Sequence, residues 1–212
     1  KILFVGPGLL PIPPKGWGGI EHLVWDMKLA LTKLNHDVKI VNTTNPKEII
    51  YEINNYRPDF VHVQYDDWVL LCPYIQYPCA ISTHFAYIEQ VEKMSDYKQR
   101  VFDHYPRVKP NIFALSDGII KTYHDVGIPD KNLFLTPNGL DIDAYTFTET
   151  PKYPNKSICI GKIEDRKKQY FLQEIDSLWF AGNIADNRFN QSKNYLGELP
   201  KSKIKTDLTD YG

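Results

Sequence analysis

Residues 13–21 read PPKGWGGIE and join an apolar run at residues 1–6, KILFVG, to an amphipathic segment. The continuous apolar run predicts a fully buried strand. The segment after the loop predicts a helix, because apolar residues recur at the spacing of one helical face: Ile20, Leu23, Val24, Met27 and Leu31. The N-terminal part of the chain is therefore expected to form a strand, a glycine-rich loop and a helix.

The glycines of this loop predict a phosphate site. Gly18 and Gly19 let backbone N–H groups approach a ligand closely. The first turn of a helix also has unpaired donors and a partial positive charge. A diphosphate fits both features. The other interpretation is that Gly16, Gly18 and Gly19 only form a tight turn, and the loop alone does not separate the two.

Composition narrows the class of protein. With 212 residues, 42% of them hydrophobic, the chain has the length of one domain and part of another. No apolar run approaches the roughly 20 residues that a membrane-spanning helix needs. A formal net charge of −1 with dispersed lysines gives no electrostatic basis for nucleic-acid binding. Cys72, Cys79 and Cys159 lack paired metal-ligand spacing, so we expect reduced thiols, no metal site and a cytoplasmic protein.

Short apolar runs alternate with helical patterns, which favours an α/β fold with a parallel sheet. Further strands are expected at residues 37–41, 59–64, 80–83, 111–115 and 132–136, and helices at 46–55 and 116–124. A long polar segment with several tyrosines, residues 87–108, separates two of these strands. We assign no secondary structure to it.

Residues 145–156 predict a linker, because Pro151 and Pro154 lie there among threonines and charged residues. We therefore expect a first domain over residues 1–150 and a partial second domain over residues 151–212. In the second, strands are expected at 157–161 and 177–181, a short helix at 166–173 and a last helix at 202–211.

Five motifs in this order resemble those of family 4 glycosyltransferases of the GT-B fold. They are residues 16–21 at the helix start, NHDV at 35–38, Thr83-His84 after a strand, PNGLD at 137–141, and Gly161-Lys162 followed by Arg166-Lys167. The resemblance extends from Lys1 to about Lys168. It implies two Rossmann-like domains facing each other across a cleft, the first for a glycan, lipid or small-molecule acceptor and the second for a nucleotide-diphosphate sugar. It also implies retention of anomeric configuration and no obligatory metal or other cofactor.

Such a transferase must stabilise the diphosphate that leaves the anomeric carbon. Lys162 and Lys167 follow the strand that begins at Ser157, and open α/β sheets bind ligands at the carboxyl ends of strands. We therefore expect both lysines to act in catalysis and Arg166 to contact the donor. The family more often has an arginine where Lys162 stands, so this chain offers a point charge in place of a bidentate fork. The alternative is that these cations and Lys168 only form the solvated start of a helix.

His84 follows a strand, where the resemblance places a histidine that contacts the transferred sugar or the acceptor. We expect a catalytic role for His84, and a structural histidine is the other interpretation. For His62, which lies inside a strand, we favour the structural interpretation. Asp66 and Asp67 follow that strand and are candidates for binding acceptor hydroxyls, although adjacent acids are also common in solvated loops.

The resemblance also assigns loop residues to donor binding. Gly18 and Gly19 are expected to face the diphosphate from the first domain. Asn138 and Gly139 are expected to shape the loop beneath the donor, with Gly139 in an unusual backbone conformation.

The C-terminal part departs from the family pattern. A second Rossmann-like domain needs on the order of 100 to 200 residues, and this part is shorter. The two glutamates with which the family binds the donor, separated by seven residues, have no match after Glu174. We therefore expect a truncated donor domain that does not transfer sugar by itself. A partial sheet would leave an unpaired edge and expose Trp179 and Phe180, which predicts either self-association or a missing segment that covers them.

Two other functions stay open. A nucleotide-dependent oxidoreductase would also have a strand, a glycine loop and a helix, although residues 16–19 do not fit the dinucleotide fingerprint. A non-catalytic fragment would bind an acceptor or a partner protein without transferring anything. The role of four apolar residues near the glycine loop also stays open: Leu9, Leu10, Ile12 and Trp17. They would either contact a lipid acceptor or a membrane surface, or they would pack against the neighbouring domain.

Overall fold

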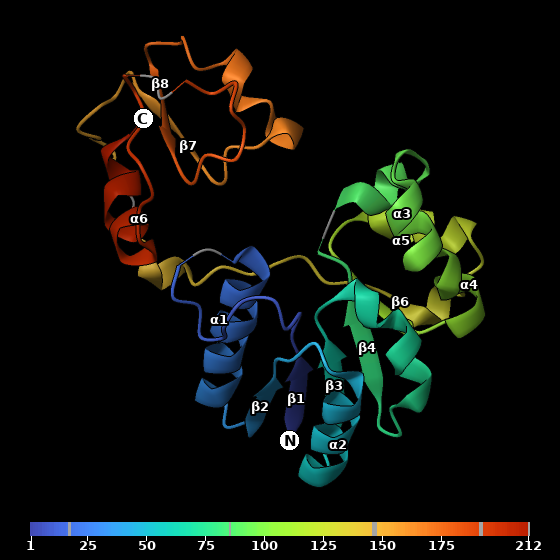
Figure 1. Cartoon of the computed structure of the whole chain (residues 1–212). Helices are drawn as coiled ribbons and strands as arrows, with labels where there is room; N and C mark the ends of the chain where they lie inside the picture. Colours follow the sequence, from blue (N-terminus) through green and yellow to red (C-terminus); the bar gives the residue numbers. More distant parts are fainter. Residues whose placement is uncertain (17, 85, 146–147, 191–192, 212) are drawn as a thin grey trace. The chain divides into compact units, whose positions relative to one another are not determined.

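A computed structural model describes residues 1–16, 18–84, 86–145, 148–190 and 193–211 (Figure 1). The chain divides into two compact units, Lys1–Gly139 and Leu140–Gly212. The predicted linker, residues 145–156, lies within the second unit, and its residues 146–147 fall outside the described ranges. In these ranges, no helix is both long enough and apolar enough to cross a membrane.

The first unit is built on a six-stranded parallel sheet with the strand order β2-β1-β3-β4-β5-β6. The strands are β1 (Ile2–Val5), β2 (Val38–Val41), β3 (Phe60–Val63), β4 (Cys79–Ser82), β5 (Asn111–Ala114) and β6 (Leu133–Leu135). Each begins and ends within about one residue of the expected range, so the predicted α/β class with a parallel sheet is confirmed.

Helices cover the two faces of this sheet, and β1 contributes to both cores because its side chains alternate between the faces. The main helices are α1 (Gly19–Lys33), α2 (Pro46–Tyr56) and α5 (Asp117–Asp125). Leu3 and Val5 belong to the larger core, which also contains buried residues of α2 and α5. Phe4 instead packs with Val24 of α1 in a smaller core.

Two helices begin where local capping signals predict. The Asn45 side chain accepts a hydrogen bond from Lys47 N (3.1 Å), and Pro46 occupies the first position of α2. Ser116 Oγ accepts one from Ile119 N (3.2 Å) at the start of α5. Both side chains satisfy a backbone donor that has no partner within the helix.

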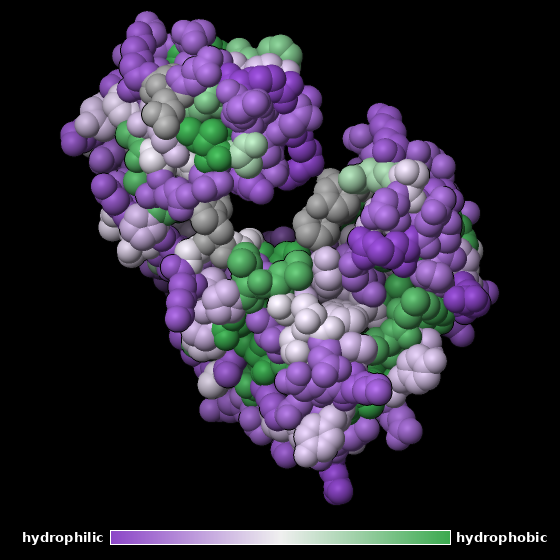
Figure 2. All heavy atoms as spheres, viewed as in Figure 1, coloured by the Kyte–Doolittle hydropathy of each residue, from purple (hydrophilic) through white to green (hydrophobic). Residues whose placement is uncertain are grey.

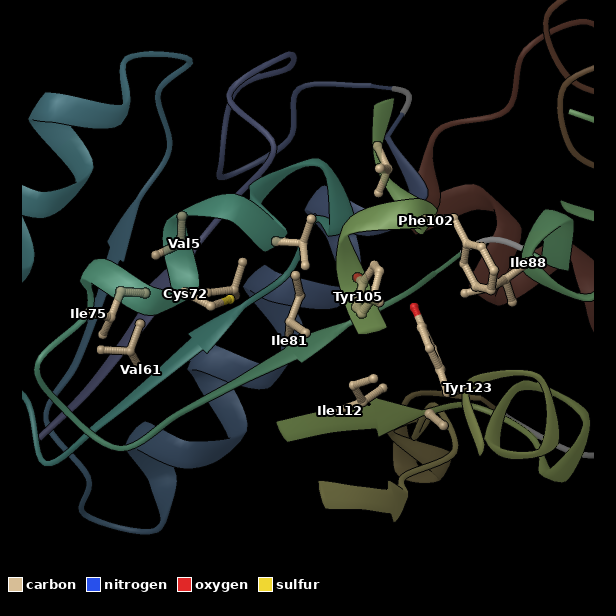
Figure 3. Close-up of a cluster of buried hydrophobic side chains, with 14 of the residues drawn as sticks. Val5, Val61, Cys72, Ile75, Ile81, Ile88, Phe102, Tyr105, Ile112 and Tyr123 are labelled. Atoms are coloured by element: carbon tan, nitrogen blue, oxygen red, sulfur yellow. The ribbon is translucent and has the colours of Figure 1, made fainter. Parts of the chain in front are cut away.

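The polar segment at residues 87–108 contributes to the core. It forms the turns η2 (Ala86–Lys93) and η3 (Phe102–His104) and the short helices α3 (Ser95–Arg100) and α4 (Tyr105–Val108). Six of its apolar or aromatic side chains are buried: Ile88, Val91, Tyr97, Val101, Phe102 and Tyr105. Figure 3 shows Tyr105 beside Tyr123 of α5, with ring centroids 4.7 Å apart. The segment therefore packs as a layer over the sheet.

His62 lies inside β3 among aromatic side chains. Its ring packs edge-on against Phe4 and Phe113, with centroid separations of 5.6 and 4.9 Å. His62 Nε2 lies 2.7 Å from Ser82 Oγ, and burial lowers the pKa of the imidazole to about 3. These contacts favour the structural interpretation of this histidine.

The loop before α1 carries apolar side chains in different surroundings. Leu9 and Leu10 are exposed, whereas Ile12 packs against the smaller core of the first unit. Trp17 lies outside the described residues. On the face shown in Figure 2, hydrophobic areas are separated by hydrophilic ones. Contact of Leu9 and Leu10 with a lipid or membrane stays a prediction.

The second unit contains two parallel strands, β7 (Ser157–Ile160) and β8 (Leu178–Ala181), and a last helix, α6 (Lys201–Asp207), followed by the turn η8 (Leu208–Asp210). The helix expected at residues 166–173 is wrong. Two 3₁₀ turns stand there, η6 (Asp165–Lys167) and η7 (Gln169–Phe171). Lys168 between them has a φ of 56°, a left-handed conformation that interrupts a regular helix.

The expected exposure of Phe180 and of the edge of β8 is also wrong. Phe180 is fully buried in a small core with Ile163 and Phe189. The segment Asn194–Leu196 runs along β8: Phe180 N donates to Asn194 O (2.9 Å) and Leu196 N to Phe180 O (2.8 Å). Trp179 is half-buried beside Tyr153, with ring centroids 6.3 Å apart. The basis of the predicted self-association is therefore removed at this edge.

Phe180 and Phe171 form a matched pair for testing this core. Phe180→Ala should lower the free energy of unfolding by about 3–5 kcal/mol, because it leaves a cavity in a closed core. Phe171 is 70% exposed, and Phe171→Ala should change it by less than about 0.5 kcal/mol. Amide hydrogen exchange of β7 and β8 measures both effects. Equal protection in the two variants would contradict the core described for this unit.

Candidate functional site

The first candidate site lies at the carboxyl edge of the six-stranded sheet. β1 pairs with β2 on one side and β3 on the other, so the strand order reverses at β1. Open α/β sheets bind ligands at such a reversal. Gly6 and Gln64 follow β1 and β3 there, and Gln64 N donates to Val5 O (2.9 Å). The hydrogen bond holds the end of β3 against the end of β1.

His84 lies at this edge and contacts Gln64. His84 follows β4, and its Nε2 lies 2.9 Å from Gln64 Oε1. Burial lowers the pKa of His84 to about 4, so the ring is neutral at pH 7. The Gln64 side chain is fully buried, yet its Nε2 has no partner in the part of the chain that the structure describes. A buried amide donor without a partner is costly, which makes it a candidate for donating to a ligand oxygen.

The glycine loop meets α1 at a buried carboxylate. Gly18 precedes α1 with a φ of 127°, and a Cβ atom built there would lie 2.5 Å from Glu21 Oε2. Glu21 is 5% exposed. Gly19, in contrast, has open space: a Cβ there meets no atom within 4 Å. Glu21 places a carboxylate near the predicted diphosphate path, so the loop by itself is not a simple anion site.

A polar pocket of about 450 Å³ begins at the residues that follow β3. Its wall includes Asp66, Asp67, Tyr97 and Arg100. Tyr97 OH donates to Asp66 Oδ2, and Arg100 forms an ion pair with Asp67. Burial raises the pKa of Asp66 to about 6, and the hydrogen bond from Tyr97 opposes that shift. The two predicted acids therefore lie in one pocket, with Asp66 buried and Asp67 paired.

The second candidate site lies at the carboxyl end of β7, within the second unit. Gly161 has a φ of 143°, and a Cβ there would lie 2.9 Å from Lys167 Nζ. The structure therefore brings the Lys167 ammonium over the backbone that leads into Lys162. Both lysines are exposed. The predicted site residues of this unit, Lys162, Arg166 and Lys167, all belong to this one loop.

The charges of this loop are not equivalent. Arg166 is paired with Glu164 (2.6 Å) and Lys168 with Asp165 (2.7 Å). Within the described ranges, neither Lys162 nor Lys167 makes an ion pair. Two cations are thus available to an external anion, whereas their neighbours are already neutralised.

Buried Gln169 holds this loop in shape, a role that the sequence did not predict. Its Nε2 donates to Lys162 O (3.0 Å), and its Oε1 accepts from Glu164 N (3.1 Å). Arg188 adds a second support, because it pairs with both Asp165 and Asp186. The sequence offered no local signal for either, since each acts on residues brought close by the turns η6 and η7.

Asn138 and Gly139 lie after β6 and are both exposed. Thr136 N donates to Ala114 O (2.7 Å), which ends the strand pairing before this loop. The expectation of an unusual backbone conformation at Gly139 is wrong, because Gly139 does not have a positive φ. A Cβ atom at this position would meet no atom within 4 Å. Within the described residues, neither the backbone conformation nor the packing therefore requires a glycine here. The role of both residues in donor binding stays a prediction.

Comparisons with known proteins support the fold. No protein-family model matches the chain, and no curated protein sequence matches it. The structure of Anabaena HepE in complex with UDP and glucose is similar, with 14% identity and a TM-score of 0.59 over 94% of this chain and 69% of that chain. The structure of S. aureus MnaA with UDP is similar over 96% and 69%, with 13% identity and a TM-score of 0.56. The shared architecture is the Rossmann-like half of a GT-B-type fold, as predicted.

The buried acid of the pocket predicts a pH dependence of stability. Asp66 has a pKa of about 6 in the folded protein against an ordinary value of 3.8. The folded state then binds the proton more tightly, so this contribution is complete below pH 3.8 and is lost as the pH rises through 6. Between those values, the wild-type free energy of unfolding should fall by about 3 kcal/mol relative to Asp66→Asn.

Urea denaturation of both proteins at a series of pH values measures this difference. The buried histidines His62 and His84 titrate in both proteins and cancel in the comparison. Asp96→Asn is the matched control, because Asp96 lines the same pocket with a side chain that is 91% exposed. A wild-type profile for Asp66→Asn would show that the buried carboxyl does not titrate as described.

Proposed function

We propose that this protein is a glycosyltransferase that moves a sugar from a nucleotide-diphosphate sugar to a hydroxylated acceptor. The single observation that carries the proposal is at the carboxyl end of β7, where the ammonium groups of Lys162 and Lys167 make no ion pair with any residue that the structure describes. Their two neighbours in the loop, Arg166 and Lys168, have carboxylate partners. The free pair therefore offers positive charge where open α/β sheets bind phosphates.

Charge stabilisation of the leaving group is the chemistry that this site supports. When the bond between the anomeric carbon and the diphosphate oxygen breaks, negative charge builds up on the diphosphate. Two ammonium groups carried by a loop with a fixed backbone favour that charge. Gln169 supplies the rigidity, because it ties Lys162 O to Glu164 N. Arg166 is paired with Glu164, so its guanidinium can contact the donor only if it binds both groups or breaks that ion pair.

His84 is the proposed contact to the transferred sugar from the first unit. Burial keeps the imidazole neutral at pH 7, and its Nε2 donates to Gln64 Oε1. His84 therefore offers a sugar the acceptor Nδ1 rather than a charge. Gln64 fixes the ring, and its buried Nε2, which has no partner among the described residues, lies at the same edge. A sugar hydroxyl, which both donates and accepts hydrogen bonds, fits this pair.

The acceptor is proposed to bind in the polar pocket beside Asp66 and Asp67. Carboxylates accept hydrogen bonds from hydroxyls, and the tyrosines of the wall, Tyr65 and Tyr97, add apolar surface. These groups favour a hydroxylated acceptor group, as in a glycan or a glycoside. Retention of configuration follows only from the resemblance to family 4 and is part of the proposal.

UDP is the proposed nucleotide, since the two solved structures described above contain it. Lys167→Ala should weaken binding of UDP or inorganic pyrophosphate by roughly ten- to hundredfold, as expected for a lost charged hydrogen bond. Lys168→Ala removes the same charge one residue away, where Asp165 already neutralises it, and should change the affinity less than about threefold. Isothermal titration calorimetry of this chain measures both.

Three results would count against the proposed diphosphate site. They are an unchanged affinity in Lys162→Ala/Lys167→Ala, equal losses in Lys167→Ala and Lys168→Ala, and no binding of UDP by the wild-type chain. Incubation of this chain with labelled UDP-sugars and simple glycosides then tests the expectation that the short second unit binds the nucleotide but does not transfer sugar by itself; robust turnover would contradict that expectation.

Substitutions at Gly19 and Gly18 test whether the glycine loop takes part in the same reaction. Gly19→Val should leave the melting temperature nearly unchanged, because a Cβ there meets no atom within 4 Å. It should weaken nucleotide-sugar binding, because we expect the diphosphate to lie against Gly19, where the branched side chain would stand. Gly18→Val should instead lower the melting temperature, since Gly18 combines a φ of 127° with close contact to Glu21. Normal sugar-nucleotide affinity in Gly19→Val would restrict these glycines to the turn.

A further inference from the structure

Two cysteines of the first unit line one small pocket. Cys72 lies in the turn η1 (Asp66–Tyr74), and Cys79 is the first residue of β4. Both belong to the wall of a pocket of about 310 Å³, together with Tyr77, Pro78 and Asn111. Cys72 is buried and Cys79 half-buried, and neither forms a disulfide. A small reagent that enters this pocket therefore reaches the two cysteine residues.

The two thiols also contact each other. The hydrogen bond between their side chains raises the pKa of Cys72, and burial adds to this effect. The same hydrogen bond lowers the pKa of Cys79, whereas burial of Cys79 opposes that shift. Cys72 Sγ lies 3.8 Å from Trp68 O, which orients it within η1. The reactive cysteine must be reached by the reagent, and Cys79 is the more exposed thiol of the two. Cys79 is therefore the nucleophile of the pair and Cys72 the second, resolving thiol.

The connection between the cysteines favours their approach. Residues 72–79 read CPYIQYPC, with Pro73 and Pro78 beside the two cysteines. Each proline ring fixes one backbone dihedral and so reduces the conformations of the connecting segment. Ile75 N donates to Cys72 O (3.2 Å), and Val61 N to Pro78 O (2.9 Å), so both ends are tied to regular structure. Figure 3 shows Cys72 among the core side chains beside Ile75 and Val61.

We propose that Cys72 and Cys79 form a reversible dithiol–disulfide pair that is oxidised by low-molecular-weight disulfides. The Cys79 thiolate attacks one sulfur of the reagent, forms a mixed disulfide and releases one reagent thiolate. Cys72 then loses its proton to solvent, attacks the Cys79 sulfur and releases the second reagent thiolate. In total, two protein thiols and one reagent disulfide give one protein disulfide and two reagent thiols.

The bond would connect the end of η1 directly to the start of β4. η1 begins at Asp66, in the wall of the polar pocket, and β4 leads to His84. The oxidised form therefore closes residues 72–79 into a loop that lies between these two groups in the sequence. A reducing thiol reverses the reaction, which separates this pair from a permanent structural disulfide.

The sequence makes the test direct. Trypsin releases both cysteines in one peptide, residues 48–93, because the Arg57–Pro58 bond resists cleavage, and it releases Cys159 in residues 157–162. The folded chain is treated with hydroxyethyl disulfide, alkylated with N-ethylmaleimide and analysed by mass spectrometry. We expect peptide 48–93 to lose two hydrogen atoms and escape alkylation, while peptide 157–162 is alkylated as in the untreated chain. Dithiothreitol should restore both thiols.

Cys72→Ser provides the mechanistic control. This variant should stop at a stable hydroxyethyl adduct on Cys79, whereas Cys159→Ser should behave as the wild type. Two separate adducts on the wild-type peptide, a bond between two chains, or full alkylation under conditions that oxidise free dithiothreitol would each overturn the proposal. These outcomes are measured on the wild-type chain and do not depend on how the serine variants fold.

Discussion

Pairing of β1 along both of its edges is the constraint on which the first unit depends. Ile2 lies opposite Val38 on one side and Phe60 on the other, and the pairing continues in register to Val5. Because these strands run parallel, their carboxyl ends meet at one edge of the sheet. That edge collects Gly6, Gln64 and, through β4, His84. The position of the candidate site thus follows from strand pairing, before any polar contact is considered.

Much of this fold is encoded locally, and the exceptions have physical reasons. Continuous apolar runs such as residues 1–6 and capping residues such as Ser116 act within a few positions, so they are visible in the sequence. The secondary structure of residues 87–108 is not predictable from periodicity, because the buried side chains lie on short turns and helices that share no single repeat. Burial of Phe180 depends on Asn194–Leu196, and no local pattern announces that contact.

The candidate sites divide in the same way. Sequence position placed Lys162 and Lys167 after a strand, but it did not separate them from Arg166, since the pairing state depends on where Glu164 points. Gln64 carries no catalytic signature, and only its burial and unpartnered amide make it noticeable. Glu21 belongs to the motif at residues 16–21, but its effect on a bound anion depends on its burial beside Gly18, which the sequence does not reveal. Local chemistry was thus predictable, whereas charge compensation was not.

The segment Asn194–Leu196 has a consequence for how copies of this chain meet. A second chain that adds to β8 must first displace the hydrogen bonds between Phe180 and this segment. Association at that side is then an exchange of an internal strand-like segment for an external one, rather than simple growth of the sheet. Opening within one molecule, whose rate is independent of protein concentration, would therefore have to precede it.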